Sequence, residues 1–399
     1  MTDSYTDKAN ALAIQRILDT HPVLVGCETA ASALGLQQGH LGHAGPPFSS
    51  PQEIPPTVLN ALAGAAVHEG WAGDVDTASV LILEGAITLH SNHDLGTVSP
   101  MAGVVRPGQL LMRIENRGGN EVVHATLAEC GHKALRFGCY DAGIGERLDY
   151  LDQIIGPRII QALPAYGLPL LPLIAEGVAL GDDTHQRNVG AMYAFTRGLP
   201  TLGAEVRNWL LDTPQHFLNY AMAAAKLSLD RASGIEGSSI ITAISRNGAQ
   251  CGVRIAGAGQ RWFTHAASTP DGRFFVPHTS ADAQPDLGDS AIVEAYGLGG
   301  TIAHVAPELA RLMVQDWPHA QATGQRMRDL FVSQHPAITP ALAGVAGVGV
   351  GLDARKVVAA GESIRIHTGI AHRDGEAGWI GIGVAQAPVE CFQAALNAL

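Results

Sequence analysis

The sequence predicts an α+β protein with three successive regions, and three observations support that prediction. Helix-like and strand-like segments alternate over residues 1–142, apolar residues recur at helical spacing over 143–213, and short strands with glycine turns dominate after Ser238. With 399 residues, of which 46% are hydrophobic, the chain is long enough for two or three packed domains. We therefore expect an N-terminal α/β domain at 1–142, a helical domain at 143–213 and a C-terminal α/β domain at 214–399.

The elements of the first region follow from composition and turn signals. Residues 40–56 are rich in glycine, proline and serine, which favour loops. The run N-R-G-G-N between two apolar segments indicates a hairpin-like connection. In chain order, the pattern predicts a helix at 7–20, a strand at 22–26, a loop at 40–56, helices at 56–70 and 77–85, a short strand within 87–103, and paired short strands at 104–124.

A helix followed by a buried strand is predicted where the C-terminal region begins. Residues 214–233 are rich in alanine, methionine and leucine, which are strong helix formers. The glycines of G-I-E-G end this helix, and the apolar run at 238–245 predicts a buried strand before the turn at 246–248. Further strands are predicted at 363–367 and 379–383, with a glycine-rich loop between them.

The segment G-I-E-G-S-S between that helix and strand is a candidate anion-binding loop. Glycine lets backbone N–H groups approach an anion closely, and serine adds hydroxyl donors. The turn after the strand adds an arginine and an asparagine, although a tight turn without function could use the same residues. The candidate substrate-binding residues of this segment are Glu236, Gly237, Ser238, Ser239, Arg246 and Asn247.

The densest polar run of the chain, G-D-D-T-H-Q-R-N, is a second candidate site. On a helix, Asp182, His185 and Asn188 would share one face because they are three residues apart. A carboxylate beside an imidazole orients the ring and raises its basicity, which suits general-base catalysis. We therefore predict Asp182 and His185 as catalytic and Arg187 and Asn188 as substrate-binding. The alternative is a solvated helix start with an aspartate as N-cap.

Two further segments contain candidate residues. Asp289 and Ser290 stand at a predicted helix start, where they either bind substrate or cap the helix. His372 and Arg373 lie in the glycine-flanked loop between two strands. An arginine binds a carboxylate or phosphate through its planar fork, and a histidine beside it moves a proton. We predict His372 as catalytic and Arg373 as substrate-binding, with an ordinary surface turn as the alternative.

Neither a metal nor a cofactor is predicted. Metal ligation is conceivable through two H-x-x-H pairs, at His40/His43 and His90/His93. Such pairs in loops lack the geometry of H-E-x-x-H on a helix. The sequence contains no P-loop, no G-x-G-x-x-G dinucleotide fingerprint and no G-x-S-x-G nucleophile elbow.

Charge and composition exclude several classes of protein. The net charge of −12 argues against nucleic-acid binding, which requires basic surface. No apolar run approaches the roughly 20 residues of a membrane span, and the first residues lack a signal-peptide pattern. The five cysteines are dispersed and form no C-x-x-C motif, so neither a disulfide framework nor a zinc site is indicated. We expect a cytoplasmic protein that does not contact membranes.

Several motifs together resemble a family catalogued as domain-of-unknown-function family 1116. They occur in family order over nearly the whole chain, from His43 to Cys391, and jointly they are specific. The matching motifs are H-A-G-P-P, S-P-M-A-G, L-R-F-G, G-D-D-T-H-Q-R-N, A-M-A-A-A-K with G-I-E-G-S-S, R-W-F-T, D-L-G-D-S-A-I and T-G-I-A-H-R-D-G.

The resemblance implies two α/β domains with short mixed sheets and a small helical domain between them. It also implies a role in allantoin and purine-nitrogen catabolism, as a subunit resembling that of oxamate carbamoyltransferase. Such an enzyme interconverts oxalurate plus phosphate with oxamate plus carbamoyl phosphate. The implied partners are small anionic substrates, an acyl-CoA-synthetase-like protein subunit and further copies of the chain.

Carbamoyl transfer requires an anion cradle, a cation for the acceptor carboxylate, donors for the tetrahedral oxyanion and a base. Our hypothesis places the cradle at residues 237–239 and assigns Arg246 and Arg373 to the anions. His185, oriented by Asp182, or His372 would be the base.

Two alternatives remain open from the sequence. The first is a hydrolase or ligase that acts on another small carboxamide or ureido substrate. In the family, Cys-His or Cys-Asn more often occupies positions 183–186, which makes a different substrate conceivable. The second is a non-catalytic subunit whose polar loops form an interface with a partner protein.

Overall fold

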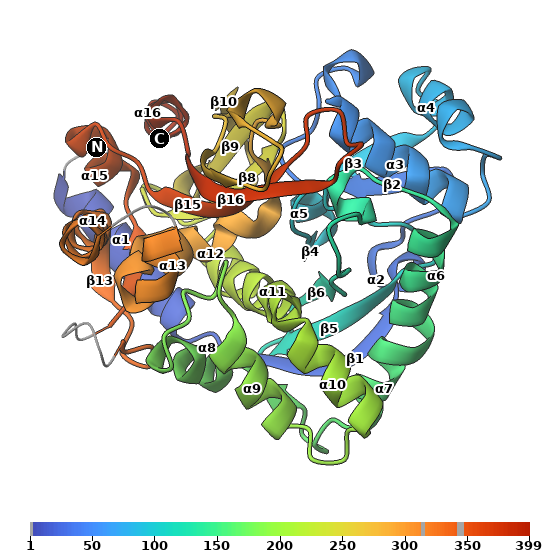
Figure 1. Ribbon diagram of the computed structural model, residues 1–399. Helices are drawn as coiled ribbons and strands as arrows, with labels where there is room; N and C mark the ends of the chain where they lie inside the picture. Colours follow the sequence, from blue (N-terminus) through green and yellow to red (C-terminus); the bar gives the residue numbers. More distant parts are fainter. Residues whose placement is uncertain (1–2, 313–315, 341–346) are drawn as a thin grey trace.

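The computed structural model describes residues 3–312, 316–340 and 347–399, and it confirms the predicted mixed α+β architecture (Figure 1). Several small sheets are surrounded by helices. The largest sheet has five strands in the order β4-β6-β5-β1-β7. Its strands are β1 (Pro22–Thr29), β4 (Thr97–Val98), β5 (Leu110–Asn116), β6 (Val122–Thr126) and β7 (Leu168–Pro169).

The predicted hairpin is confirmed, because β5 and β6 pair antiparallel across the N-R-G-G-N segment. Strand β1 also pairs antiparallel with β5, while β4 lies parallel to β6. One expectation for this region is wrong: part of the loop predicted at 40–56 is strand β2 (His40–His43), which pairs in parallel with β3 (Thr88–Ser91). The partner strand is distant in sequence, so local composition could not indicate the pairing. The helices of this region are α1 (Asp3–Leu18), α2 (Ala30–Leu34), α3 (Pro56–His68), α4 (Val75–Leu83) and α5 (Asn92–Leu95).

The middle of the chain is largely helical, as predicted. Helix α6 passes through a π-helical segment (Leu151–Ile155) into α7 without leaving the helical conformation. The helices are α6 (Ala142–Tyr150), α7 (Gly156–Gln161), α8 (Leu170–Ala179), α9 (Val189–Arg197), α10 (Ala204–Asp212) and α11 (Phe217–Asp230). The polar run before α9 is not helical but forms a loop, which corrects the predicted helical face for Asp182, His185 and Asn188.

The last region contains two antiparallel sheets and a further strand pair. One sheet has the order β10-β9-β8-β12, the second β11-β16-β15, and β13 pairs with β14. Its strands are β8 (Ile241–Asn247), β9 (Gln250–Ile255), β10 (Phe263–Ala266), β11 (Asp271–Phe274), β12 (Leu287–Gly288), β13 (Phe331–Gln334), β14 (Gly349–Leu352), β15 (Arg365–Ala371) and β16 (Trp379–Gln386). Its helices are α12 (Ile292–Ala295), α13 (Pro307–Leu312), α14 (Trp317–Asp329), α15 (Ala354–Ala360) and α16 (Val389–Leu396), with 3-10 helices at Asp289–Ala291 and Gly299–Val305.

Helix α11 lies at the centre of the molecule and joins the regions (Figure 1). All of its residues except Asp230 are buried, and it packs against β6, β8, α8 and α12. Its alanines allow these elements to approach closely, while Phe217 and Tyr220 form an aromatic cluster with Phe195 of α9. The main core contains residues from all three predicted regions. The domain boundaries near 142 and 213 therefore stay predictions.

A loop of the N-terminal region is fixed to the C-terminal region beside α12. Pro100 forms an antiparallel bridge with Gly288, the last residue of β12. Gly288 has a φ of +123°, and a Cβ added there would lie 2.7 Å from the backbone nitrogen of Met101. Only glycine fits this close approach. The bridge places the loop around Met101 next to the segment that begins at Asp289.

In the described part of the chain, no helix has the length and apolar character that a bilayer crossing requires. The described residues also contain no group of three or more histidine, cysteine or acidic side chains arranged to hold a metal ion.

Candidate functional site

A cavity of about 470 Å³ opens between the three regions of the chain. This volume lies in the range of about 300–1,000 Å³ that small-molecule sites occupy. Its wall combines polar side chains with a large apolar area. The lining residues are Pro100, Met101, Cys130, Gly131, His132, Arg136, Phe137, His185, Gln186, Asp212, Thr213, Pro214, Gln215, Leu218, Ser290, Leu309, Gly369, Trp379 and Ile382.

Backbone strain is concentrated at this cavity. Met101 and Thr184 both have a φ of +60°, and they are the non-glycine residues with positive φ in the described ranges. Met101 lines the cavity and Thr184 precedes His185. The left-handed conformation is costly for a β-branched residue such as threonine, and such strain tends to occur at functional sites. The two residues with strained backbone therefore lie at or next to the cavity.

His185 is one of two histidines in the cavity lining, together with His132, and its partner is Glu294 of α12. The distance from His185 Nδ1 to Glu294 Oε1 is 2.7 Å, and the Glu294 side chain is fully buried. Since Nδ1 is held by the carboxylate, Nε2 is the nitrogen that His185 can present to a ligand. A carboxylate that holds one ring nitrogen fixes the tautomer and stabilises the ring when it takes up a proton. The pair has the geometry of an oriented general base.

The predicted orientation of His185 by Asp182 is therefore wrong. Asp182 forms an ion pair with Arg187, and its second oxygen accepts a hydrogen bond from the backbone nitrogen of Ala191 at 2.8 Å. Burial raises the pKa of Asp182 to about 6. Asn188 is buried and donates from Nδ2 to the His185 carbonyl at 3.0 Å. These three side chains fix the loop around His185 and do not line the cavity.

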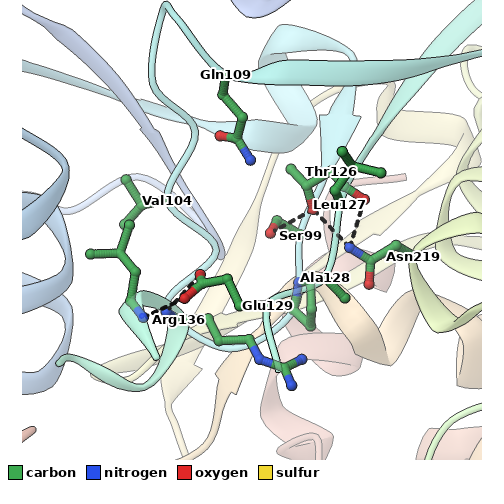
Figure 2. A pocket seen from close by; sticks show the side chains of 11 residues that line it. Ser99, Val104, Gln109, Thr126, Leu127, Ala128, Glu129, Arg136 and Asn219 are labelled. Atoms are coloured by element: carbon green, nitrogen blue, oxygen red, sulfur yellow. Dashed lines mark hydrogen bonds between the residues drawn. The ribbon is translucent and has the colours of Figure 1, made fainter. Parts of the chain in front are cut away.

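Arg136 supplies a cation to the same cavity, and the sequence analysis did not assign it a role. Its backbone nitrogen donates to the buried carboxylate of Glu129 at 3.2 Å, but its guanidinium is turned away from that carboxylate (Figure 2). Nε of Arg136 is buried and has no hydrogen-bond partner among the described residues. Burial lowers the pKa of this guanidinium, and the charge of Glu129 partly offsets the effect. A half-buried guanidinium with an unused donor is suited to bind an anion.

A narrow crevice adjoins the cavity and shares Pro100 and Arg136 with it (Figure 2). The Thr126 hydroxyl donates to Ser99 at 3.0 Å, and Asn219 donates from Nδ2 to the Thr126 carbonyl at 2.7 Å. These bonds connect β6 with α11 and with the loop that precedes Met101. These hydrogen bonds thus fix the part of the chain that borders the cavity near Arg136.

Three rings of the cavity lining, those of His132, Phe137 and Trp379, pack on one another. Trp379 stacks on Phe137 with 6.0 Å between ring centroids and an angle of 8° between the planes. His132 also stacks on Trp379, with 5.2 Å between ring centroids. The Trp379 indole donates to the Gly381 carbonyl at 2.6 Å, which fixes the ring. Such a surface is suited to contact planar groups such as amides.

Asp289 organises the loops below the cavity. It is fully buried, and its oxygens accept hydrogen bonds from the backbone nitrogens of Gly45 and Ser99, both at 3.0 Å. The Ser245 hydroxyl donates at 2.6 Å and Asn92 Nδ2 at 3.0 Å. Burial raises the pKa of Asp289, and these donors partly offset the effect. The carboxylate does not line the cavity, but the next residue, Ser290, does.

Arg246 lies behind Ser290. Its Nε donates to Asp286 at 2.7 Å, and its Nη2 donates to the Ser290 hydroxyl at 3.5 Å. The guanidinium is 1% exposed, so it reaches a ligand through Ser290 and not directly. Asn247, the next residue, donates to the Pro46 carbonyl at 2.9 Å and is not part of the cavity wall.

The predicted anion cradle at residues 237–239 and the neighbouring candidate Glu236 lie elsewhere in the fold. Ser238 donates to Asn10 Oδ1 at 2.9 Å, and Ser239 donates to Asp353 Oδ1 at 2.7 Å. Glu236 is exposed, and Gly237 has a φ of +75° in the turn. None of these residues lines the cavity, and the two hydroxyls hold α1 to the start of α15.

His372 and Arg373 are on the surface. The His372 ring packs edge-to-face on His278 at 5.6 Å, and its Nδ1 accepts a hydrogen bond from the backbone nitrogen of Asp374 at 3.3 Å. Arg373 is exposed and donates to the Ala281 carbonyl at 3.3 Å. The structure does not bring this pair into contact with the cavity wall.

The histidines of the two H-x-x-H pairs are partly brought together. His40 Nδ1 lies 2.9 Å from His90 Nε2, and the two rings are stacked. His43 bonds to the Ala44 carbonyl at 2.8 Å, and burial lowers its pKa to about 4. His93 lies 3.6 Å from Asp289, and burial lowers its pKa well below the usual range.

Comparison with known proteins gives one consistent family. A family model described as oxamate carbamoyltransferase subunit AllG matches residues 87–290. The oxamate carbamoyltransferase subunit AllG of Escherichia coli K12 is 34% identical over 98% of this chain and 97% of its own length. The uncharacterized protein YahG of the same organism is 32% identical over 97% of this chain and 84% of its own.

A solved structure has the same fold. It is the crystal structure of a conserved protein of unknown function from Enterococcus faecalis V583, with a TM-score of 0.92 and 30% sequence identity. The match covers 99% of this chain and 97% of the other.

Proposed function

Because the chain belongs to the family of oxamate carbamoyltransferase subunit AllG, we propose that it is a carbamoyltransferase subunit and that the cavity at His185 holds the transfer reaction. The reaction would move a carbamoyl group between a phosphate oxygen and the amide nitrogen of oxamate. Both substrates are small anions, so the site needs a cation, a base and donors for the developing oxyanion.

Arg136 is the proposed anion-binding residue, and this is the observation that carries the proposal. Its Nε has no partner in the described structure, and its guanidinium lines the same cavity as His185. A guanidinium binds a carboxylate or a phosphate with two parallel hydrogen bonds. The proposed ligand of Arg136 is the oxamate carboxylate or the phosphate of the donor.

His185 is the proposed base. An amide nitrogen is a weak nucleophile, and its attack on the carbamoyl carbon requires removal of a proton. Nε2 of His185 would accept this proton, while Glu294 stabilises the resulting imidazolium through Nδ1. The arrangement resembles the carboxylate–histidine pair of other acyl-transfer enzymes in geometry.

Ser290 is the proposed donor to the substrate. Its oxygen accepts a hydrogen bond from Arg246, so its own proton is available to a ligand in the cavity. The stacked rings at Trp379 would contact the planar amide faces.

The chain would act in a complex, since the relative is named as a subunit. An acyl-CoA-synthetase-like protein and further copies of the chain are the partners that we propose. The cysteines Cys27, Cys130, Cys139, Cys251 and Cys391 are free thiols, which supports the proposed cytoplasmic location.

The proposal is tested by replacing Arg136 with glutamine. Hydrogen bonds to charged groups contribute about 1.5–3 kcal/mol, so we expect the Kd for oxamate or for carbamoyl phosphate to rise about 10- to 100-fold. Calorimetric titration of the purified chain measures the Kd, and transfer between carbamoyl phosphate and oxamate is assayed with the subunits that copurify.

Arg158→Gln is the matched control, because Arg158 is exposed on α7 and lies outside the cavity. Unchanged binding of both ligands by the Arg136→Gln protein would contradict the proposed site. Absence of carbamoyl transfer by the wild-type complex would contradict the proposed function.

A further inference from the structure

A second histidine–carboxylate pair lies beside the first. Nδ1 of His367, in β15, is 2.5 Å from Oδ2 of Asp183, in the loop before His185. Both side chains are buried, with 2% of His367 and none of Asp183 exposed. Burial raises the pKa of Asp183, but the hydrogen bond from His367 and the backbone donors lower it by more than burial raises it. The net pKa is therefore below the usual range. Asp183 is therefore an ionised carboxylate at neutral pH.

The two pairs are interlocked. Asp183 Oδ1 also accepts a hydrogen bond from the backbone nitrogen of His185 at 3.1 Å. In return, Glu294 Oε1 accepts a hydrogen bond from the backbone nitrogen of His367 at 3.1 Å. Each carboxylate thus holds the ring of one histidine and the backbone of the other. Four buried hydrogen bonds fix the positions of the two imidazoles relative to each other.

His367 does not itself line the cavity, but it lies on the same face of β15 as a residue that does. Gly369, two residues further along the strand, lines the cavity, and so does Ile382, its partner on β16. The pairing of β15 with β16 is regular from His367 to Gly369, so these two residues lie on the same side of the sheet. Since Nδ1 of His367 is bound to Asp183, Nε2 is the nitrogen that it can present to a ligand.

A transfer reaction of the proposed kind moves two protons. As the carbon–nitrogen bond forms, the amide nitrogen loses a proton to a base. As the carbon–oxygen bond to phosphate breaks, the bridging oxygen takes the electron pair and needs a proton, because fully deprotonated phosphate is a poor leaving group. When the two bonds change in one concerted step, a single imidazole cannot serve both, because it would have to be deprotonated for the attack and protonated for the departure at the same time. A second proton carrier then provides the acid.

We propose that His367, held by Asp183, is the general acid that protonates the leaving phosphate oxygen, while His185, held by Glu294, is the base. This assignment rests on the proposed carbamoyl transfer. In the direction that forms oxalurate, His185 gains the amide proton, and His367 gives its proton to the bridging oxygen, so that the phosphate leaves as hydrogen phosphate. In the reverse direction the two rings exchange roles. The ionised Asp183 stabilises the protonated form of the ring beside it.

The test uses His367→Asn, which keeps an amide donor where Nδ1 donates to Asp183 but has no counterpart of Nε2. General acid catalysis contributes about 10²- to 10⁴-fold, so we expect kcat to fall by about that factor while the KM for oxamate changes less than about threefold. The matched control is His124→Gln, which alters another histidine–carboxylate pair, the buried His124 with the partly exposed Glu28, outside the cavity. This control is expected to keep its kcat.

A second variant separates proton transfer from structure. His367→Ala opens a space beside Asp183, and added imidazole is expected to raise its kcat at least about tenfold, without an effect on the wild type. A kcat of His367→Asn within about threefold of the wild type would overturn the assignment. Loss of activity in both variants without rescue by imidazole would also overturn it, since the ring would then be structural. A wild-type complex that transfers no carbamoyl group would refute the proposed function, and the assignment with it.

Discussion

At the scale of the single residue, the chemistry of the cavity depends on which carboxylate holds which ring. Glu294 is separated from His185 by 109 positions, and Asp183 from His367 by 184. No local spacing rule connects such residues. The sequence identified His185 from its polar neighbours, but the same neighbours suggested Asp182 as its partner. The structure shows that Asp182 instead forms an ion pair with Arg187 and accepts a hydrogen bond from the backbone nitrogen of Ala191 in α9.

Replacement of Glu294 by glutamine tests the partner of His185. Glutamine keeps an oxygen that can accept hydrogen bonds from Gly300 and His367, which Glu294 now accepts at 2.9 and 3.1 Å. It lacks the charge that stabilises a protonated His185. We expect kcat for carbamoyl transfer to fall by about 10²-fold or more, with the fold retained by circular dichroism.

Asp182→Asn is the comparison that distinguishes the two carboxylates. Asparagine keeps an acceptor for the Ala191 nitrogen and loses the ion pair with Arg187. Its effect on kcat is expected to stay within a few-fold. The assignment of Glu294 is refuted if Asp182→Asn reduces kcat more than Glu294→Gln does.

Arg136 illustrates a different limit of the sequence. It occurs in L-R-F-G, a short motif of the family resemblance that carries no recognisable chemistry by itself. Its value as a ligand arises because Glu129 binds backbone nitrogens and leaves the guanidinium to the cavity. Conversely, Ser238 and Ser239 have the residue types of an anion loop, but their hydroxyls are used by Asn10 and Asp353. The residue types show which interactions a side chain can make. Whether its polar atoms are free to bind a ligand depends on the partners that the fold places beside it.

At the scale of the element, most helices and strands could be predicted because their signals are local. The helix predicted at 56–70 corresponds to α3, and the strands predicted at 363–367 and 379–383 correspond to β15 and β16. The run before α9 was predicted helical from spacing alone. It is a loop because Asp183 accepts three successive backbone N–H groups, from His185, Gln186 and Arg187. A side chain that binds backbone donors in this way competes with helix formation.

Substitution of Gly288 by alanine tests how the loop at Met101 is held. The positive φ is unfavourable for alanine, and the new Cβ would meet the Met101 nitrogen at 2.7 Å. We expect the free energy of unfolding to fall by about 1–3 kcal/mol and the KM for oxamate to rise, because Met101 lines the cavity. Urea unfolding and steady-state kinetics measure the two effects.

Gly259→Ala is the control that distinguishes the cost of the positive φ from the cost of the steric contact. Gly259 has a φ of +63° and nothing within 4 Å of its added Cβ, so this variant carries the backbone cost alone. Its KM is expected to stay at the wild-type value. Equal effects of both substitutions on KM would contradict a role of the Pro100–Gly288 bridge in shaping the cavity.

At the scale of the whole molecule, the cavity exists because the three predicted regions pack against one core. The sequence patterns led us to predict three regions, whereas their mutual packing could not be predicted, because it depends on pairings between distant residues. Helix α11 contacts both the first sheet and β8, and His216, just before it, connects the segment after β6 with α11. His216 Nδ1 accepts a hydrogen bond from the Ala128 nitrogen at 3.4 Å, and its Nε2 lies 3.1 Å from the Tyr220 hydroxyl.

This position makes His216 a probe of the stability of the whole fold. Burial lowers its pKa to about 3, whereas an unfolded histidine titrates near about 6.5. As the pH falls below about 6.5, the unfolded chain therefore takes up a proton that the folded chain does not. The contribution of this histidine to the free energy of unfolding is complete above that pH and is lost as the pH falls toward about 3, at about 1.4 kcal/mol per pH unit.

His216→Asn keeps an acceptor for Ala128 and does not titrate in this range. Urea unfolding of both proteins between pH 7 and pH 4 should show a stability difference that narrows by about this slope below pH 6.5, because their other titrating groups are the same. A stability difference that stays constant with pH would mean that His216 accepts a proton in the folded protein as readily as in the unfolded chain. Water would then reach the region where α11 packs on the first sheet.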